Sequence, residues 1–447
     1  MDKHKIIIIA LAVLLVIVTT LVPPFFGRND DGGVSGLISE NGLSYPGEIQ
    51  EDSLNHSFAV TDQSEGSFMP VIAAKKMSAM LHSGFDTRMM ALVYLALFLI
   101  GLCLIISSID VINKKAQIFV CIFAAIILCD VAYTSYFNSF YYEALYLSAL
   151  TLLFGSLMFM FGKESNSITA VVIALLAVTV IASSGAFGVA VAMLTAALFF
   201  TIGFWDKSKI RKPFTVATAL LIVAIALSVL SVAPSIKGGD RDRYNALFCG
   251  VLYGSEDVNA DLAYFGIPEE YASFADKTYD EAGKEINLEN GIVKENLFSK
   301  ITTSKITSFY LSHPKRLFGV FNKAAKAAPS LSQDYVSTKT DKSFLKTAPA
   351  LWSTVHRFLM PGSLFVLLAL FIVITVLAAI SMKKMPFFSK TVIFSVLTAC
   401  VLLAEPVISG GLANISRRLI LFQFAYDMII LMCVNWIINA VTLHRAK

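Results

Sequence analysis

The most constraining feature of this sequence is the recurrence of long apolar segments. The first, IIIIALAVLLVIVTTLV, follows MDKHK and ends at Pro23 and Pro24. Apolar segments of about 17–25 residues are long enough to cross the hydrocarbon core of a membrane as helices. Of the 447 residues, 56% are hydrophobic and 15% are charged, and a soluble domain could not bury that much apolar surface. The sequence therefore predicts an all-α polytopic membrane protein.

About ten membrane spans are predicted. We expect the first apolar segment to be retained as a helix, because no small-residue cleavage site of a signal peptide follows it. The short pair of segments around IASSGAFG has an alternative interpretation as a re-entrant hairpin. The other spans are predicted at about 89–109, 116–134, 142–161, 168–183, 188–205, 213–232, 361–381, 390–405 and 417–440.

Lysine and arginine in the short loops predict the orientation, because cytoplasmic loops contain more of these two residues than external loops do. One set of loops contains Lys114, Lys115, Arg211 and Lys383, whereas the loops at 135–141 and 183–187 contain neither residue. Both termini are therefore expected in the cytoplasm of a multi-pass cell-membrane protein. The predicted organisation is 1–22, first transmembrane helix; 23–88, external loop; 89–232, helices two to seven; 233–360, a mainly helical external domain; and 361–447, helices eight to ten.

Composition argues against several classes of function. The net charge of +4 is small and lies mostly in short loops, so it does not indicate nucleic-acid binding. No pair of the six cysteines suggests a disulfide framework. The histidines lack metal-ligand spacing, and the sequence contains no glycine-rich phosphate loop or Ser-His-Asp pattern. No cofactor or metal is predicted from the residues.

The first cluster of candidate site residues follows the first helix, in PPFFGRNDDGG. Arg28, Asp30 and Asp31 lie here among glycines that allow a tight bend and close approach to a ligand. A carboxylate at this position could act as a general base towards a hydroxyl. The alternative is an ordinary polar turn after a helix end, since this composition is common in turns.

A second cluster lies in CDVAYTSYFNSFYYEALYL, at the predicted external ends of two spans. Asp130 and Glu143 flank a polar and aromatic run that includes Asn138 and Tyr141. Ionisable residues at membrane depth are costly and usually face a polar interior. An aromatic belt at the membrane interface would explain the tyrosines but not the two carboxylates.

The third cluster lies in AEPVISGGLANISRRLILFQFAYDMII. Arg417 and Arg418 begin the last predicted span at its external end, and on one continuous helix Asp427 would lie about 13 Å deeper. Arginine can hold a phosphate with a planar fork of donors; the alternative is that these side chains reach out to lipid headgroups. Arg88, in HSGFDTRMM, repeats the pattern at another span.

Two segments of the second polar region have open interpretations. KGGDRDRYN, residues 237–245, could be a basic lip over a phosphate or a solvated linker. SHPKRLFGVFNKAAKAAPSL predicts an amphipathic helix capped by Ser312, with Pro314 in its first turn. That helix could lie in the membrane interface or pack on the external domain.

Taken together, the chain resembles the GT-C superfamily of polytopic glycosyltransferases, in an unassigned bacterial branch. The stretches that carry this resemblance are NDDGG, HSGFDTRMM, YFNSFYYE, RYNALFCGVLYGSEDVNADLAYFGI, FYLSHPKR and GGLANISRRLILF. They are scattered over most of the chain, and the middle spans match only in hydropathy. The branch has one acid before the glycine, so that either Asp30 or Asp31 is its counterpart.

The resemblance implies transfer of a sugar from a polyprenyl-phosphate donor to a glycan, polymer or lipid acceptor at the external face, with inversion. Asp31 or Asp30 would be the general base, with Glu143 as the fallback. Arg417 or Arg418 would stabilise the departing phosphate, with Arg88 as a further candidate. The other substrate-binding residues would be Arg28, Asp130, Asn138, Tyr141 and Asp427. A divalent ion between Asp31 and Glu143 is left open.

Two rival functions remain at this stage. One is a polymerase or ligase of lipid-linked oligosaccharides, which would show clusters of histidine and arginine in paired external loops. The other is a flippase or transporter of lipid-linked glycans, without catalysis, for which repeat symmetry and broken helices would be expected. Neither pattern is evident in this sequence.

Overall fold

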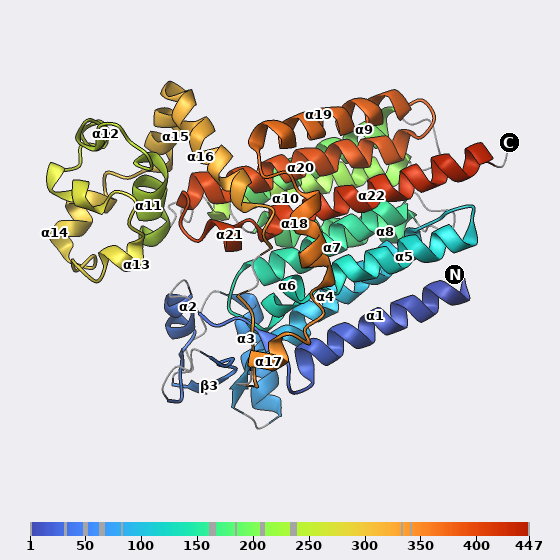
Figure 1. Ribbon diagram of the computed structural model, residues 1–447, viewed down its shortest axis with the longest axis horizontal. Helices are drawn as coiled ribbons and strands as arrows, with labels where there is room; N and C mark the ends of the chain where they lie inside the picture. Colours follow the sequence, from blue (N-terminus) through green and yellow to red (C-terminus); the bar gives the residue numbers. More distant parts are fainter. Residues whose placement is uncertain are drawn as a thin grey trace.

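The molecule is a bundle of long apolar helices with polar segments gathered at one end, as Figure 1 shows. The structure, a computed structural model, describes residues 2–30, 34–47, 52–61, 68–81, 84–160, 167–183, 186–205, 211–232, 239–331, 334–339 and 342–445. The start of the first helix and the end of the last lie together at the opposite end of the bundle from the polar segments.

Each of the ten predicted spans is helical. Among the described residues, seven helices are long and apolar enough to cross a membrane, and three shorter apolar stretches lie at Ile168–Ala182, Phe187–Gly203 and Phe214–Ile225. The number of crossings stays a prediction. The ten helices are α1 (Lys3–Leu21), α4 (Thr87–Ser108), α5 (Lys114–Leu128), α7 (Glu143–Met160), α8 (Ser167–Ala182), α9 (Ala186–Trp205), α10 (Arg211–Val232), α19 (Leu364–Ser381), α20 (Pro386–Gly410) and α22 (Ile420–Arg445).

Helices α4 and α7 approach each other through glycine. A Cβ atom on Gly101 would lie 2.6 Å from the carbonyl carbon of Thr151, and one on Gly155 would lie 2.6 Å from the carbonyl oxygen of Gly101. Lipid gives apolar side chains little reason to leave it, so helices in a membrane associate mainly by close packing at small residues. These two glycines therefore place the polar end of α7 firmly against α4.

The polar segment between α1 and α4 forms small sheets and two helices. Strands β2, β3 and β4 make an antiparallel sheet in the order β2-β3-β4, while β1 pairs with β5 far along the chain, Phe26 opposite Ser337. Phe58, Phe85 and Phe140 pack edge to face or stacked beneath the three-stranded sheet. The elements are β1 (Phe26–Gly27), α2 (Ser35–Glu40), β2 (Leu43–Ser44), β3 (Ser57–Val60), α3 (Met69–Met80) and β4 (Phe85–Asp86).

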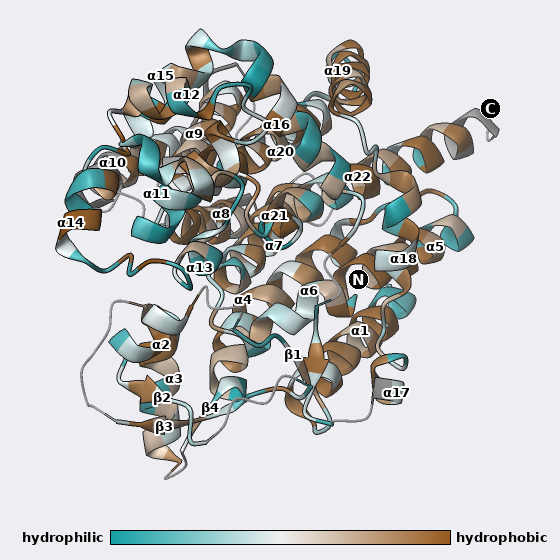
Figure 2. Cartoon of the chain, turned by 60° about the vertical axis from the view of Figure 1, so that its left-hand side comes forward, coloured by the Kyte–Doolittle hydropathy of each residue, from teal (hydrophilic) through white to brown (hydrophobic). Residues whose placement is uncertain are grey.

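After α5, the chain reaches α7 through α6 (Val131–Thr134) and the 3₁₀ helix η1 (Ser135–Asn138). The second polar segment then forms a helical domain with its own apolar core, and Figure 2 shows hydrophilic residues over α11 and α12. Its elements are α11 (Asp240–Ala246), η2 (Leu247–Val251), α12 (Val258–Phe265), η3 (Glu269–Phe274), α13 (Tyr279–Ala282), α14 (Gly291–Val293), η4 (Lys294–Phe298), α15 (Thr303–Ser312) and α16 (Pro314–Ala327).

Helix α16 connects the helical domain to the bundle. It is the predicted amphipathic helix, but it begins after His313, because Ser312 ends α15 and its hydroxyl donates to the carbonyl oxygens of Ser308 and Phe309. Ala324 packs in the core of the helical domain, whereas Ala325 packs in the core of the bundle. The helix therefore packs both on the helical domain, as one of the two interpretations expected, and on the bundle, and its location in the membrane interface stays a prediction.

The rest of the predicted external domain does not belong to this helical unit. Strand β5 (Val336–Ser337) joins β1, α17 (Lys342–Leu345) follows, and α18 (Leu351–Leu359) lies along the bundle against α5. Trp352 and His356 are buried on the inner side of α18, whereas Phe358 is exposed. The expected domain 233–360 is thus divided between a helical unit and a segment that returns to the bundle.

The helical domain docks on the end of α20 through a contact between two glycines. Gly411 has a φ of +61°, and a Cβ atom there would lie 2.6 Å from the amide nitrogen of Gly250. The Leu412 amide donates to the carbonyl oxygen of Cys249 at 3.0 Å. Only glycine combines this backbone conformation with so close an approach.

We expect Gly411→Ala to loosen the docking of the helical domain. At φ +61° and ψ −136° the backbone is in a region that almost only glycine adopts, which costs about 1–3 kcal/mol for a residue with a Cβ, and the overlap with Gly250 adds to that. Limited proteolysis of the detergent-purified protein should cut faster within residues 250–300. Gly319→Ala is the matched control, since a Cβ there meets nothing within 4 Å. Equal cleavage of the two variants would contradict this account of the docking.

Candidate functional site

A cavity of about 410 Å³ opens at the polar end of the bundle. It lies between α7, α9, α20 and the start of the last helix, with α11 of the helical domain on one side. Four of the predicted site residues line it: Tyr141, Glu143, Arg417 and Arg418. The other described lining residues are Val34, Tyr142, Tyr146, Leu150, Ile181, Ser183, Phe187, Gly188, Val191, Asp242, Leu402, Glu405 and Leu421.

This cavity is polar at one end and apolar at the other. Glu143 begins α7, and Leu150 follows two turns later, about 10 Å further into the bundle at 1.5 Å per residue. Leu402 precedes Glu405 on α20. Leu421 lies on the last helix, three residues after Arg418. The charged groups therefore lie at the mouth, and aliphatic side chains line the part within the bundle.

Arg418 is held at the mouth by partners on α20 and on the helical domain. Its Nη2 donates to the Ser409 hydroxyl at 2.7 Å and lies 3.8 Å from a carboxylate oxygen of Asp242. A Cβ atom on Gly410 would overlap the Arg418 guanidinium, so this glycine provides the space for it. The two neighbouring glycines thus have different roles: Gly410 leaves space for Arg418, and Gly411 contacts the helical domain.

Glu405 is a cavity residue that the sequence analysis missed. Its carboxylate accepts from the Ser409 hydroxyl at 2.9 Å and lies 4.0 Å from Arg418. Its side chain is 35% exposed, because it faces the cavity. Glu405 could have been identified from the sequence because it is a single carboxylate at the end of an apolar span. Such a carboxylate usually faces a polar interior.

Asp242 corrects the interpretation of 237–245 as a basic lip. The two arginines of this segment pair within the helical domain, Arg241 with Asp280 and Arg243 with Asp240. The segment therefore presents a carboxylate to the cavity. Residues 237 and 238 lie outside the described part of the chain.

Arginines and tyrosines alternate across the polar end. The Arg28 guanidinium lies 4.1 Å from the centre of the Tyr136 ring, and the Arg417 guanidinium lies 4.2 Å from the centre of the Tyr141 ring. The Tyr136 and Tyr141 rings meet edge to face at 6.3 Å, and the Tyr136 hydroxyl donates to the Arg417 carbonyl. We call these four residues the arginine–tyrosine ladder. Cation–π contacts of this kind contribute about 0.5–2 kcal/mol each, more when desolvated.

A second cavity, of about 480 Å³, lies on the other side of the ladder. Tyr141 and Arg417 line both cavities, so that this pair forms the wall between them. The described residues lining the second cavity are Arg28, Asn29, Tyr141, Asp334, Leu412, Asn414, Ile415, Ser416 and Arg417. The sequence analysis did not select Asn29, Asp334, Asn414 or Ser416.

The two predicted aspartates of the first polar loop are Asp30 and Asp31. Asp31 lies outside the described residues. Asp30 accepts a hydrogen bond from the Val34 amide at 2.9 Å and lines a small hollow with Tyr45. Burial and, to a smaller extent, the negative charge of Asp30 raise the pKa of Tyr45 to about 12. Asn29 lines the second cavity and Val34 the first, so this loop borders both.

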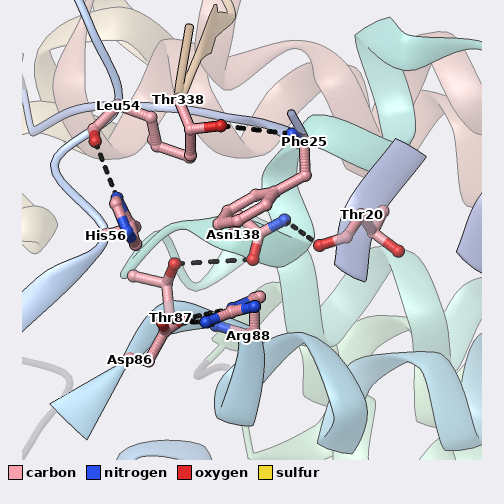
Figure 3. Close-up of polar contacts among 9 residues, drawn as sticks. All are labelled: Thr20, Phe25, Leu54, His56, Asp86, Thr87, Arg88, Asn138 and Thr338. Atoms are coloured by element: carbon pink, nitrogen blue, oxygen red, sulfur yellow. Dashed lines mark hydrogen bonds and ion pairs between the residues drawn. The ribbon is translucent and has the colours of Figure 1, made fainter. Parts of the chain in front are cut away.

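Asn138 holds the polar loop to the bundle. Its Nδ2 donates to the carbonyl oxygens of Thr20 at 2.7 Å and Phe26 at 2.9 Å, and its Oδ1 accepts from the Thr87 hydroxyl at 3.4 Å. Figure 3 shows the contacts of Asn138 with Thr20 and Thr87, with Arg88 paired to Asp86 beside them. Asn138 and Arg88 are not among the described residues that line either cavity.

Asp130 and Asp427 are buried within the bundle, away from the cavities. Asp130 accepts from the amides of Ala132 and Ser353, and so ties α6 to α18. Asp427 accepts from the Tyr133 hydroxyl and the Trp352 indole, both at 2.5 Å. His356 Nε2 lies 3.4 Å from its other oxygen.

The prediction that Arg417 and Asp427 lie on one continuous helix is wrong, because the helix is interrupted. Residues Ile415–Arg418 form a separate short helix, α21, and α22 begins at Ile420. The depth derived from one continuous helix therefore does not apply. Arg417 faces the polar end, whereas Asp427 faces α18.

No group of three or more histidine, cysteine or acidic side chains that could hold a metal ion occurs among the described residues. Glu143 lines the first cavity, but Asp31, the other residue of the divalent-ion site that the sequence left open, lies outside the described part of the chain. Cys249, in the helical domain, is buried, and this burial raises the pKa of its thiol to about 12. A thiol with that pKa is protonated and unreactive at neutral pH.

The fold and its apolar helices define a polytopic helical membrane protein. The chain belongs to the family described as the YfdI N-terminal transmembrane domain, whose model matches residues 2–447. Curated proteins and solved structures gave no match to the chain.

We expect Asp427 to act on stability. Asp427→Ala leaves the Tyr133 hydroxyl and the Trp352 indole without their acceptor, at about 1–3 kcal/mol for each buried donor. Thermal unfolding of the purified protein should show a clearly lower midpoint. Arg418→Ala, at the open cavity, should lower the midpoint much less. If Asp427→Ala melts like the wild type, the buried cluster does not stabilise the bundle.

Proposed function

We propose that this protein is an inverting membrane glycosyltransferase of the GT-C type. It moves a sugar from a polyprenyl-phosphate donor to a glycan, polymer or lipid acceptor. The observation that carries the proposal is the first cavity, where two arginines and several carboxylates at a polar mouth continue into aliphatic walls. A lipid-linked phosphosugar has the same division between a charged headgroup and an apolar chain.

In this proposal Arg417 and Arg418 hold the donor phosphate. A guanidinium offers a planar fork of donors that suits two phosphate oxygens and stays charged at all relevant pH values. The prenyl chain extends along Leu402 and Leu421. As the bond from the anomeric carbon to the phosphate oxygen breaks, negative charge grows on that oxygen, and charge fixed beside it lowers the barrier.

A carboxylate accepts the proton of the attacking hydroxyl. The hydroxyl oxygen forms a bond to the anomeric carbon from the face opposite the phosphate, and the phosphate leaves with the bonding electrons. Asp31 is our first choice for this base because of its place in the loop that borders both cavities. Glu143 is the alternative, since it lies in the cavity, whereas Asp30 is already bonded to the Val34 amide.

The site would face the outside of the cell. Both ends of the chain lie at the other end of the bundle, where the lysine-rich short loops are predicted. The positive-inside tendency assigns that end to the cytoplasm. The donor would therefore be used after it has been moved across the membrane.

Phosphate binding predicts a graded series of variants at Arg418. Arg418→Ala should lower sugar transfer about 10²–10³-fold, the usual effect of removing a donor to developing charge, while Arg418→Lys should restore only part. Gly410→Ala should also lower transfer, because its Cβ displaces the guanidinium, with little loss of stability. The assay is release of polyprenyl phosphate from a panel of polyprenyl-phosphate hexoses by protein in lipid vesicles. Full activity of Arg418→Ala would remove this arginine from the mechanism.

The base predicts a large effect from one carboxamide substitution. Asp31→Asn should lower transfer about 10²–10⁴-fold, since an amide cannot accept the proton, with donor binding retained. Asp30→Asn should cost far less, because an amide oxygen can still accept from the Val34 amide. Glu143→Gln is measured alongside in the same assay. A wild-type rate for both Asp31→Asn and Glu143→Gln would exclude general-base catalysis by these residues.

A further inference from the structure

We propose that the second cavity binds the sugar of the acceptor, with Asn414 and Ser416 as its specific contacts. This inference rests on the function proposed above, in which the first cavity takes the donor. The inference places the acceptor in a cavity separate from that of the donor. The acceptor class is an uncharged glycan with free hydroxyl groups, and its contacts Asn414 and Ser416 were not selected from the sequence.

The position of the cavity is the first argument. A transfer between two substrates requires two binding spaces that meet where the bond is exchanged. Tyr141 and Arg417 line both cavities, so an acceptor in the second cavity reaches the donor phosphate at this wall. The Tyr141 hydroxyl donates to the Asn29 carbonyl oxygen at 3.1 Å, which fixes the wall to the loop that contains Asp30.

The chemistry of the lining is the second argument. Among the described residues that line the cavity, Leu412 and Ile415 are the aliphatic ones. Such a surface does not suit a lipid chain. The amide of Asn414 and the hydroxyl of Ser416 can each donate and accept, as sugar hydroxyls do. The carboxylate of Asp334 can accept hydrogen bonds from sugar hydroxyls as well.

The volume agrees with this class of ligand. About 480 Å³ is within the range of pockets that enclose small ligands. The cavity lies at the polar end of the bundle, beside the loops that would face water. A glycan attached to a polymer or a lipid can therefore enter without crossing the apolar part of the bundle.

Asn414 can be replaced by glycine without a change in the backbone conformation. It has a φ of +48°, in the left-handed region that glycine adopts without strain. Its backbone carbonyl accepts from the amides of Arg417 and Arg418, and glycine keeps both bonds. Asn414→Gly therefore removes the side-chain amide while it keeps the backbone conformation and both backbone hydrogen bonds at the start of α21.

The experiment uses the full chain in lipid vesicles with a polyprenyl-phosphate hexose. The acceptor probe is the envelope glycan fraction of the cells that make the protein. Asn414→Gly and Ser416→Ala should each raise the amount of this fraction needed for half-maximal transfer by about 2- to 10-fold, the effect of one lost hydrogen bond. The donor concentration for half-maximal rate should not change. Ser312→Ala, an exposed hydroxyl on α15, is the matched control and should match the wild type.

Binding of the same glycan fraction, followed by saturation-transfer NMR, separates this proposal from the proposed function. Binding that the wild type shows and the double variant Asn414→Gly/Ser416→Ala loses supports the cavity even if no transfer occurs. A wild type that neither binds nor uses the glycan fraction overturns the assignment. So does an unchanged acceptor requirement in both variants, or a change confined to the donor.

Discussion

The rest of this structure depends on the need of each apolar segment to satisfy its own backbone hydrogen bonds in lipid. Helices meet that need within one segment, and the ten apolar helices pack into a bundle through small residues such as Gly101 and Gly155. Charged chemistry is then confined to the ends of the helices and to the polar segments between them. The residues that line the two cavities include members of those polar segments, such as Asp242 and Asn29.

At that end, most charged groups are positioned by neighbours from distant parts of the chain. The arginine–tyrosine ladder joins Arg28 after α1, the tyrosines before α7 and Arg417 before α22. Burying a guanidinium is costly unless it is paired or hydrogen-bonded, and Arg28 also donates to Ser135 and Ala132. The ladder therefore gives two cations fixed places beside open cavities.

Hydropathy alone predicted the helical segments, because length and apolar composition are local properties. The selection of Tyr141, Glu143, Arg417 and Arg418 also agrees with one cavity, since each is a polar group at the end of an apolar run. Sequence could not separate these from Asp130, Asn138 and Asp427, whose partners lie up to 294 residues away. It also missed the break at Leu419 and the contribution of Glu405, which depend on tertiary packing.

The placement of α11 has a mechanical consequence. This helix belongs to a domain with its own core, yet Asp242 extends from it to within 3.8 Å of Arg418. One of the charges at the mouth of the bundle is thus supplied by a domain that packs on α20 at Gly250 and Gly411 and is joined to the bundle by α16. Any tilt of that domain about the glycine contact changes the distance between Asp242 and Arg418. A tilt of the helical domain would therefore alter the electrostatic field at the first cavity without any change within the bundle itself.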